Sequence, residues 1–207
     1  MSLFIVRLNR VDLLTLSGVA SAALAAGAAL DGKTHLATSL LFLAMLVDAL
    51  DGIWARRRGV VRDFGRYLDG FMDVLVYLAT PALVLYLHGF SGFWSLALLA
   101  MTAAGCIRLS VFNDTGNIRT EDIRTGGGRL AYLGMPVFWS LFILGGFLLL
   151  EYVLPPIIAR SLLALALVAF SVAMLLNRPF FKFTALWQIL ALTLGGATLF
   201  LVLHLRA

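Results

Sequence analysis

The chain has 207 residues, of which 61% are hydrophobic and only 13% are charged, and its formal net charge is +5. This composition excludes an ordinary soluble domain and is typical of a protein with several membrane spans. The single cysteine, Cys106, excludes an internal disulfide bond. We expect one membrane-embedded domain over residues 1–207 and no nucleic-acid partner, because the sequence has no basic soluble face that would bind one.

The start of the chain predicts a helix that stays in the membrane. Residues 1–12 form a short amphipathic lead-in, in which Arg7 and Arg10 suit an anionic lipid surface. The apolar run 13–30 follows, and its Ala, Gly and Ser residues favour close helix packing in lipid. A signal peptide has a similar pattern, but we expect a retained first helix because further apolar runs follow.

More apolar runs follow the first, and each is near the ~20 residues that cross a bilayer. They cover about residues 35–55, 67–88, 92–113, 133–154, 156–176 and 183–204. The sequence therefore predicts an all-α polytopic membrane protein, a bundle of six core transmembrane helices plus about one extra span.

Loop charges predict the orientation of this bundle. If successive loops alternate between the two sides, one side receives thirteen of the sixteen Lys and Arg residues, and the other receives only Lys33, Arg160 and Arg206. Cytoplasmic loops carry the excess of positive charge in membrane proteins. We therefore expect the N-terminus at the cytoplasmic face of an inner membrane and, after seven spans, the C-terminus outside.

Four aspartates lie where the second and third apolar runs meet. Asp48 and Asp51 end one run, and Asp69 and Asp73 begin the next. Spacings of three and four residues put both members of each pair on one helix face. In an antiparallel helical hairpin, all four would lie at a similar depth near the cytoplasm. Carboxylates are costly in apolar membrane sequence, so they indicate a functional site.

Divalent cations would compensate the negative charge of this hairpin. Hard cations such as Mg²⁺ prefer oxygen ligands, and a two-metal site suits in-line transfer of a phosphoryl group between two oxygens. Gly52 and Ala55 are small enough to let a ligand approach the helix backbone closely. Arg56 follows them, and its planar fork binds phosphate well. The stretch therefore predicts phosphoryl transfer.

The stretch from Asp48 to Asp73 reads D-x-x-D-G-x-x-A-R, then eight residues, then G-x-x-x-D-x-x-x-D. It resembles the signature of the CDP-alcohol phosphotransferases at every fixed position, which are Asp48, Asp51, Gly52, Ala55, Arg56, Gly65, Asp69 and Asp73. The resemblance implies that the four aspartates bind two divalent ions, Mg²⁺ or Mn²⁺, and that Asp73 takes the proton from the attacking alcohol. It implies that Gly52, Ala55, Arg56 and Gly65 form the binding region for the CDP-linked donor, and that the protein is a homodimer.

A second set of residues resembles the bacterial and archaeal phosphatidylserine synthases of this family. Arg108-Leu-Ser-Val-Phe-Asn113 matches their R-L-x-x-F-N pattern, and Gly134-Met-Pro136 is close to their G-L-P. The resemblance implies a phospholipid-synthesis enzyme that transfers a phosphatidyl group from CDP-diacylglycerol to L-serine and releases CMP. Arg108 would then bind an anion or the acceptor, although an arginine at a span end also extends to the interface.

Other acceptors stay open. The branch usually has Asp-Ser-Leu-Ala-Asp where this chain has Asp69-Gly-Phe-Met-Asp73, and Pro136-Val-Phe-Trp139 is similar to bacterial phosphatidylcholine synthases. Choline, inositol phosphate or glycerol phosphate would serve the same chemistry, and an archaeal-type lipid donor is a further alternative.

Two other interpretations of the aspartates are a structural cluster with Arg56, Arg57 and Arg58, and an ion site in a cation transporter. We favour neither, because a structural cluster does not require the glycines and the acidic signature occurs only once.

Three further features have ordinary interpretations. The loop 114–131 has glycines and arginines that suit closure over a charged headgroup, but we expect a solvated loop. Asp12 either caps a helix or approaches the site. His35, His88 and His204 are expected at the opposite membrane face, without a metal.

Overall fold

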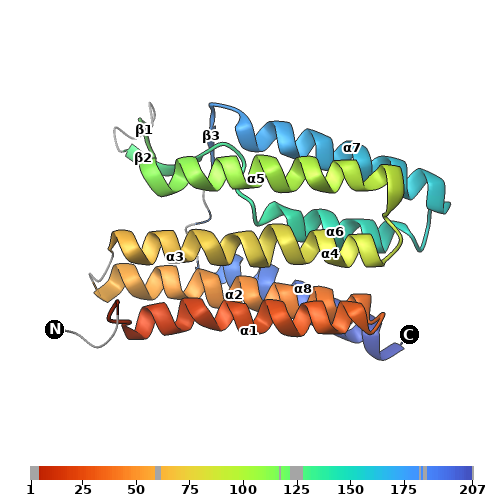
Figure 1. Cartoon of the computed structure of the whole chain (residues 1–207), viewed down its shortest axis with the longest axis horizontal. Coiled ribbons are helices and arrows are strands. Elements are labelled where there is room, and N and C mark those ends of the chain that lie inside the picture. Colours follow the sequence, from red (N-terminus) through yellow and green to blue (C-terminus); the bar gives the residue numbers. More distant parts are fainter. Residues whose placement is uncertain are drawn as a thin grey trace.

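The computed structural model describes residues 5–58, 62–116, 118–121, 128–181, 183 and 186–206, without side chains at 55–58, 118–121 and 128–130. Its α-helices run back and forth along one axis as a bundle, and α1 begins at the end opposite to the one where α8 finishes (Figure 1). The helices are α1 (Arg10–Leu30), α2 (Thr34–Arg58), α3 (Asp63–Asp73), α4 (Thr80–Leu87), α5 (Ser95–Thr115), α6 (Trp139–Leu150), α7 (Pro156–Leu175) and α8 (Leu186–Arg206).

Six helical stretches of the described chain are long and apolar enough to cross a membrane. Four of them are α1, most of α2, α7 and α8. The other two are composite: α3 continues through a π-helix, η1 (Val74–Ala79), into α4, and a short 3₁₀ turn, η2 (Gly92–Trp94), precedes α5. The chain is therefore an integral membrane protein, and the predicted all-α membrane fold is confirmed.

The apolar run 133–154 forms a shorter helix than the sequence predicts. Its helix α6 has 12 residues and begins only at Trp139. Leu133 belongs to a strand, Gly134 has φ +71°, and Pro136 has no N–H to donate. The prediction of a helix from 133 is wrong because these residues hold the chain in a turn.

A small antiparallel sheet in the order β1-β2-β3 lies at one end of the bundle, beside the ends of α5 and α7 (Figure 1). Its strands are β1 (Ile118–Glu121), β2 (Gly128–Leu133) and β3 (Pro179–Phe180). In the register, Ile118 pairs with Ala131, and Tyr132 pairs with Phe180. The predicted solvated loop 114–131 is therefore corrected where β1 and β2 pair, and residues 122–127 lie outside the described chain.

Small residues allow the helices of the core to approach closely. A Cβ at Gly105 on α5 would lie 2.5 Å from the side chain of the fully buried Leu78, and one at Gly196 on α8 would lie 2.6 Å from Phe42. Such positions are favoured in membrane bundles, where dispersion contacts between helices replace the hydrophobic effect.

The π-helix η1 is held by a neighbouring helix. Pro81 stands four residues after Tyr77 and has no N–H for the α-helical bond to the Tyr77 carbonyl. The Ser140 hydroxyl of α6 donates to that carbonyl oxygen instead, at 2.5 Å. The proline that the sequence places inside a span thus coincides with the departure from α-helical geometry.

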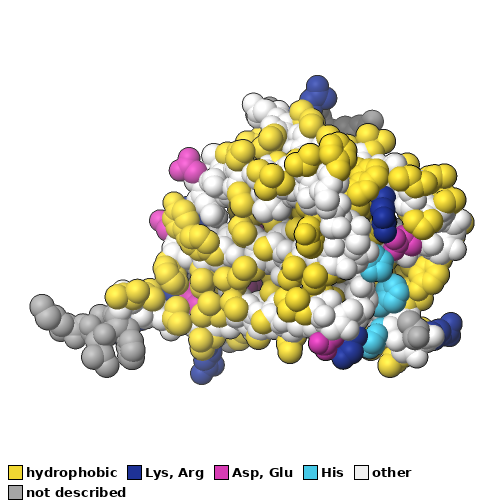
Figure 2. Space-filling model, turned by 45° about the vertical axis from the view of Figure 1, so that its right-hand side comes forward, with side chains coloured by type: hydrophobic (Ala, Val, Ile, Leu, Met, Phe, Trp, Pro, Cys, Tyr) yellow, Lys and Arg dark blue, Asp and Glu magenta, His cyan; other side chains and the backbone are white. Residues whose placement is uncertain are grey.

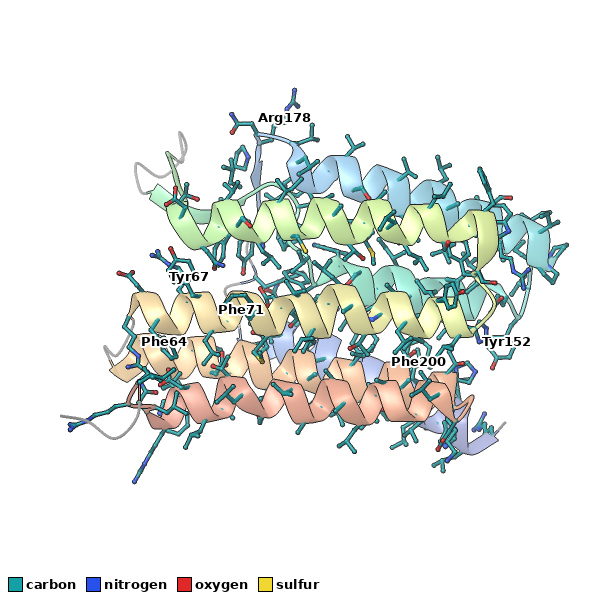
Figure 3. All side chains as sticks on the ribbon, in the orientation of Figure 1. Phe64, Tyr67, Phe71, Tyr152, Arg178 and Phe200 are labelled. Carbon is teal, nitrogen blue, oxygen red and sulfur yellow. The ribbon has the colours of Figure 1, made fainter. Side chains whose placement is uncertain are left out.

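The predicted histidines lie together at the end of the bundle far from the aspartates. His88 contacts the carboxylate of Glu151 at 2.7 Å and the hydroxyl of Thr34 at 3.0 Å. His35 contacts the Tyr152 hydroxyl at 3.0 Å. Figure 2 shows histidines beside acidic and basic side chains at this end, and Figure 3 places Tyr152 away from Phe64 and Tyr67.

We predict that Gly134→Ala destabilises the bundle by about 2 kcal/mol or more. The added Cβ would lie 2.2 Å from the Met174 carbonyl oxygen, and the positive φ disfavours any L side chain. Thermal unfolding in detergent measures this change. Gly146→Ala on α6 is the matched control, because no atom lies within 4 Å of its Cβ. Equal melting temperatures for the two variants would contradict the prediction.

Candidate active site

Helices α2 and α3 bring three of the predicted aspartates together. One carboxylate oxygen from each of Asp48, Asp51 and Asp69 lies within 4.8 Å of the others. Asp51 is buried, with 3% of its surface exposed, and the other two are half-buried. An α-helix has about 3.6 residues per turn, so residues three or four apart lie on one face. Each pair of aspartates therefore faces the neighbouring helix.

The oxygen donors of this cluster fit a hard divalent cation. Three carboxylates that converge in an apolar bundle repel one another strongly when they are ionised. Ligand sets made only of oxygen atoms favour Mg²⁺ or Mn²⁺. Asp73 stands one turn after Asp69 and outside the group of three, but it lines the same cavity. Metal binding by Asp48, Asp51, Asp69 and Asp73 stays a prediction.

A cavity of about 180 Å³ opens beside the aspartates. One wall is polar and carries the four aspartates, Gly52 and the Tyr77 hydroxyl. Another part of the lining is largely aromatic and comes from α5, β2 and the segments before α6 and α8. Its residues include Phe112, Tyr132, Phe138 and Phe183. The cavity therefore combines a site for charged groups with a surface for apolar or cationic ones.

Arg108 points into this cavity. Its side chain is 6% exposed, so the alternative in which it extends to the membrane interface does not apply. Its guanidinium lies over the rings of Phe112 at 5.1 Å and Tyr132 at 5.5 Å. Among the described residues, its Nε and Nη2 atoms have no hydrogen-bond partner. A buried cation with two open donors is costly unless an anion binds it.

Of the other predicted site residues, Gly52 lies at the cavity and Gly65 does not. Gly52 lines the cavity. Gly65 lies outside the cavity lining, on the first turns of α3, where an added Cβ would meet Arg62 and Asp12 at 3.7 and 3.8 Å. Ala55 and Arg56 belong to the end of α2, but their side chains lie outside the described chain, as do those of Arg57 and Arg58.

Asp12 belongs to the N-terminal cap of the first helix, in which Asn9 is the N-cap residue and Asp12 is residue N3. Its carboxylate accepts from the Asn9 backbone N–H at 2.7 Å, and the Asn9 side chain accepts from Asp12 in return, which forms a capping box. The same carboxylate pairs with Arg62, just before α3. The helix-cap interpretation of Asp12 is confirmed, and the ion pair also joins the start of α1 to the start of α3.

Gly70 has a packing reason to stand between the second pair of aspartates. An added Cβ would lie 2.5 Å from Nδ2 of Asn113 on α5. Only glycine permits this approach without a shift of the neighbouring side chain. The branch that this chain resembles usually has serine at this position, so the substitution coincides with a close contact between α3 and α5.

The sequence patterns missed several residues of the cavity. Tyr77 lies four residues after Asp73, so a search at helical spacing would have found it. Tyr132 and Phe183 have no local signal, because they come from separate segments that meet only in the folded chain. Phe138 lies in the Pro136–Trp139 stretch, but the sequence did not place that stretch at the cavity.

Comparison with known proteins gives a family match over most of the chain. The family described as CDP-alcohol phosphatidyltransferase matches residues 8–201. An archaetidylserine synthase of Methanothermobacter thermautotrophicus is 31% identical over 61% of this chain and 52% of its own length. A CDP-diacylglycerol–serine O-phosphatidyltransferase of Methanocaldococcus jannaschii is 30% identical over 58% of this chain and 55% of its own.

The chain is also similar to a protein whose name gives an acceptor other than serine. A phosphatidylcholine synthase of Brucella melitensis is 33% identical over 64% of this chain and 46% of its own length. The chain thus spans about half the length of the curated relatives that it matches.

We predict that Asp69→Asn lowers the affinity for Mn²⁺ by more than about tenfold, because losing a ligand costs more than losing an outer-shell partner. Calorimetric titration of the purified protein measures the dissociation constant. Asp63→Asn is the matched control, since Asp63 begins the same helix and its side chain is 86% exposed. Unchanged affinity in Asp69→Asn would exclude Asp69 as a ligand.

Proposed function

Because the chain belongs to the CDP-alcohol phosphatidyltransferase family, we propose that it transfers a phosphatidyl group from CDP-diacylglycerol to L-serine and releases CMP. The observation that carries this proposal is the cavity in which converging carboxylates face a buried arginine with open donors. Carboxylates with divalent ions suit the diphosphate of the donor, and the arginine suits an anionic acceptor.

The position of the cavity fits a lipid donor. It lies among helices that are long and apolar enough to span the membrane, so acyl chains can stay in lipid while the headgroup enters. Gly52 lies on the cavity wall directly after Asp51, where the absence of a side chain leaves room for the nucleotide part. Arg56, one turn further along α2, is proposed to bind the diphosphate.

The reaction forms one P–O bond and breaks another. The serine hydroxyl oxygen attacks the phosphorus next to the diacylglycerol, the bond between that phosphorus and the bridging oxygen breaks, and CMP leaves with the electron pair. Asp73, on the cavity wall, takes the hydroxyl proton. Divalent ions held by Asp48, Asp51, Asp69 and Asp73 would offset the negative charge of the diphosphate and of the leaving group.

Arg108 favours serine among the acceptors. Its two open donors, Nε and Nη2, match the two oxygens of a carboxylate, which serine has and choline lacks. Glycerol phosphate and inositol phosphate also carry an anion, so they are the nearest rivals on this ground.

Choline is the second candidate because the cavity has an aromatic wall. Quaternary ammonium groups bind over aromatic faces, and a similar protein of Brucella melitensis is a phosphatidylcholine synthase. However, Arg108 already lies over Phe112 and Tyr132. A second cation at these rings would be repelled, which leaves Phe138 and Phe183 for such an acceptor.

Two further points stay predictions. The excess of Lys and Arg that the sequence predicts for the loops of one side supports a site that faces the cytoplasm. The homodimer rests on the family resemblance alone.

We predict that the purified protein with Mg²⁺ or Mn²⁺ releases CMP from CDP-diacylglycerol when L-serine is present, and that Asp73→Asn lowers the rate by about 100-fold or more without unfolding. The acceptor panel is serine, choline, inositol, inositol phosphate and glycerol phosphate, with products identified by mass and an archaeal-type donor run in parallel. No CMP with any acceptor would contradict the proposed chemistry, and a product with another alcohol alone would replace serine.

We predict that Arg108→Lys raises the KM for L-serine about tenfold or more, because lysine keeps the charge but loses the planar pair of donors. The KM for serinol, which lacks the carboxylate, should not change. Arg160→Lys, at the histidine end of the bundle, is the control. Equal effects on serine and serinol would mean that Arg108 does not bind the acceptor carboxylate.

A further inference from the structure

Two hydroxyl groups from outside the acidic signature contact its first pair of aspartates. The Tyr77 hydroxyl donates to Oδ2 of Asp48 at 2.6 Å. The Thr15 hydroxyl, on α1, donates to Oδ2 of Asp51 at 2.5 Å. Both side chains are buried, with 2% of Tyr77 and 8% of Thr15 exposed. Each aspartate of α2 is therefore held by a neutral donor from a different helical segment.

The contact of Thr15 differs from the ordinary use of threonine in membrane helices. Thr38, Thr102 and Thr193 donate to carbonyls of their own helices at 2.8 to 2.9 Å. Thr15 lies 3.2 Å from the Val11 carbonyl and only 2.5 Å from the Asp51 carboxylate. Because a hydroxyl has one proton, the shorter and charge-assisted contact identifies the carboxylate as its main acceptor.

Tyr77 is fixed from both sides. Its backbone carbonyl accepts a hydrogen bond from the Ser140 hydroxyl on α6, and its side-chain hydroxyl donates to Asp48. The residue belongs to the π-helix that follows Asp73. π-Helical turns are rare and occur often at functional sites. Here the turn lies between the carboxylates of α3 and Pro81, and it presents the Tyr77 hydroxyl to Asp48 across the boundary between two spans.

A small cavity of about 10 Å³ lies behind the carboxylates, between α1, α2 and the segment from α3 to η1. Thr15, Tyr77, Asp48 and Asp51 all line it. Its volume is near that of a single water molecule, so there is little room for these carboxylates to rotate toward α1.

We propose that Tyr77 and Thr15 are positioning residues that orient Asp48 and Asp51 for divalent-ion binding, an inference that rests on the proposed function of this site. Outer-shell partners fix the direction of a ligating group, and losing one typically lowers metal affinity about 10- to 100-fold. A carboxylate without such a partner loses rotational freedom only when the ion binds, which opposes binding. The two hydroxyls remove that cost before the ion arrives.

The test is a titration of the purified protein with Mn²⁺ alone, in which the electron paramagnetic resonance signal reports free Mn²⁺. Tyr77→Phe and Thr15→Val remove the hydroxyls and keep most of the packing volume. Each is expected to raise the Mn²⁺ dissociation constant about tenfold or more. Tyr86→Phe and Thr193→Val are matched controls: Tyr86 is 49% exposed, and Thr193 is buried but donates to its own helix. Both controls should bind Mn²⁺ like the wild type.

A double-mutant cycle separates positioning from general loss of structure. If Tyr77 acts through Asp48, Tyr77→Phe should weaken Mn²⁺ binding in the wild-type background and have no further effect in Asp48→Asn. Equal loss in both backgrounds, or wild-type affinity in Tyr77→Phe and Thr15→Val, would overturn the proposal. Failure of the wild type to bind Mn²⁺ would overturn the metal site as well, whereas Mn²⁺ binding without CMP release would contradict only the proposed transfer.

Discussion

Three carboxylate oxygens lie within 4.8 Å of one another inside a bundle of apolar helices. Water screens such repulsion well, but the interior of a bundle does not, so the site needs positive charge or donors from elsewhere in the protein. The described chain brings no lysine into the cavity lining and only one arginine, Arg108. We propose that divalent ions offset the rest of the negative charge. The repulsion between the aspartates would then favour metal binding, because a bound ion relieves it.

The same constraint explains how polar groups are distributed around the cluster. Thr15 and Tyr77 donate to carboxylates without adding charge, so they can stay buried in the apolar core. Arg108 is different, because it carries a positive charge that lies over aromatic rings, while two of its hydrogen-bond donors have no partner among the described residues. The cavity thus has an acidic part suited to cations and a basic position suited to an anion, which fits the transfer that we propose.

Departures from regular helix geometry occur where the site is assembled. The π-helix follows Asp73 directly. Pro81 has no N–H to donate to the Tyr77 carbonyl, and the Ser140 hydroxyl donates to that carbonyl instead. Gly134 turns the chain between β2 and α6, so that Tyr132 and Phe138 lie on the same wall of the cavity. The histidine end of the bundle lies about 20 Å away along α2.

The sequence by itself determined the membrane class, the family resemblance and the convergence of Asp48, Asp51 and Asp69. These depend on local properties: the length of apolar runs, residue identity within one stretch, and spacings of three and four residues on a helix. It did not determine that Arg108 faces the cavity, that Thr15 contacts Asp51, or that the residues after 128 form a strand that covers the site. Each of those depends on contacts between segments far apart in the chain, and such contacts are decided by how the helices pack, because packing alone selects which face of each helix turns inward.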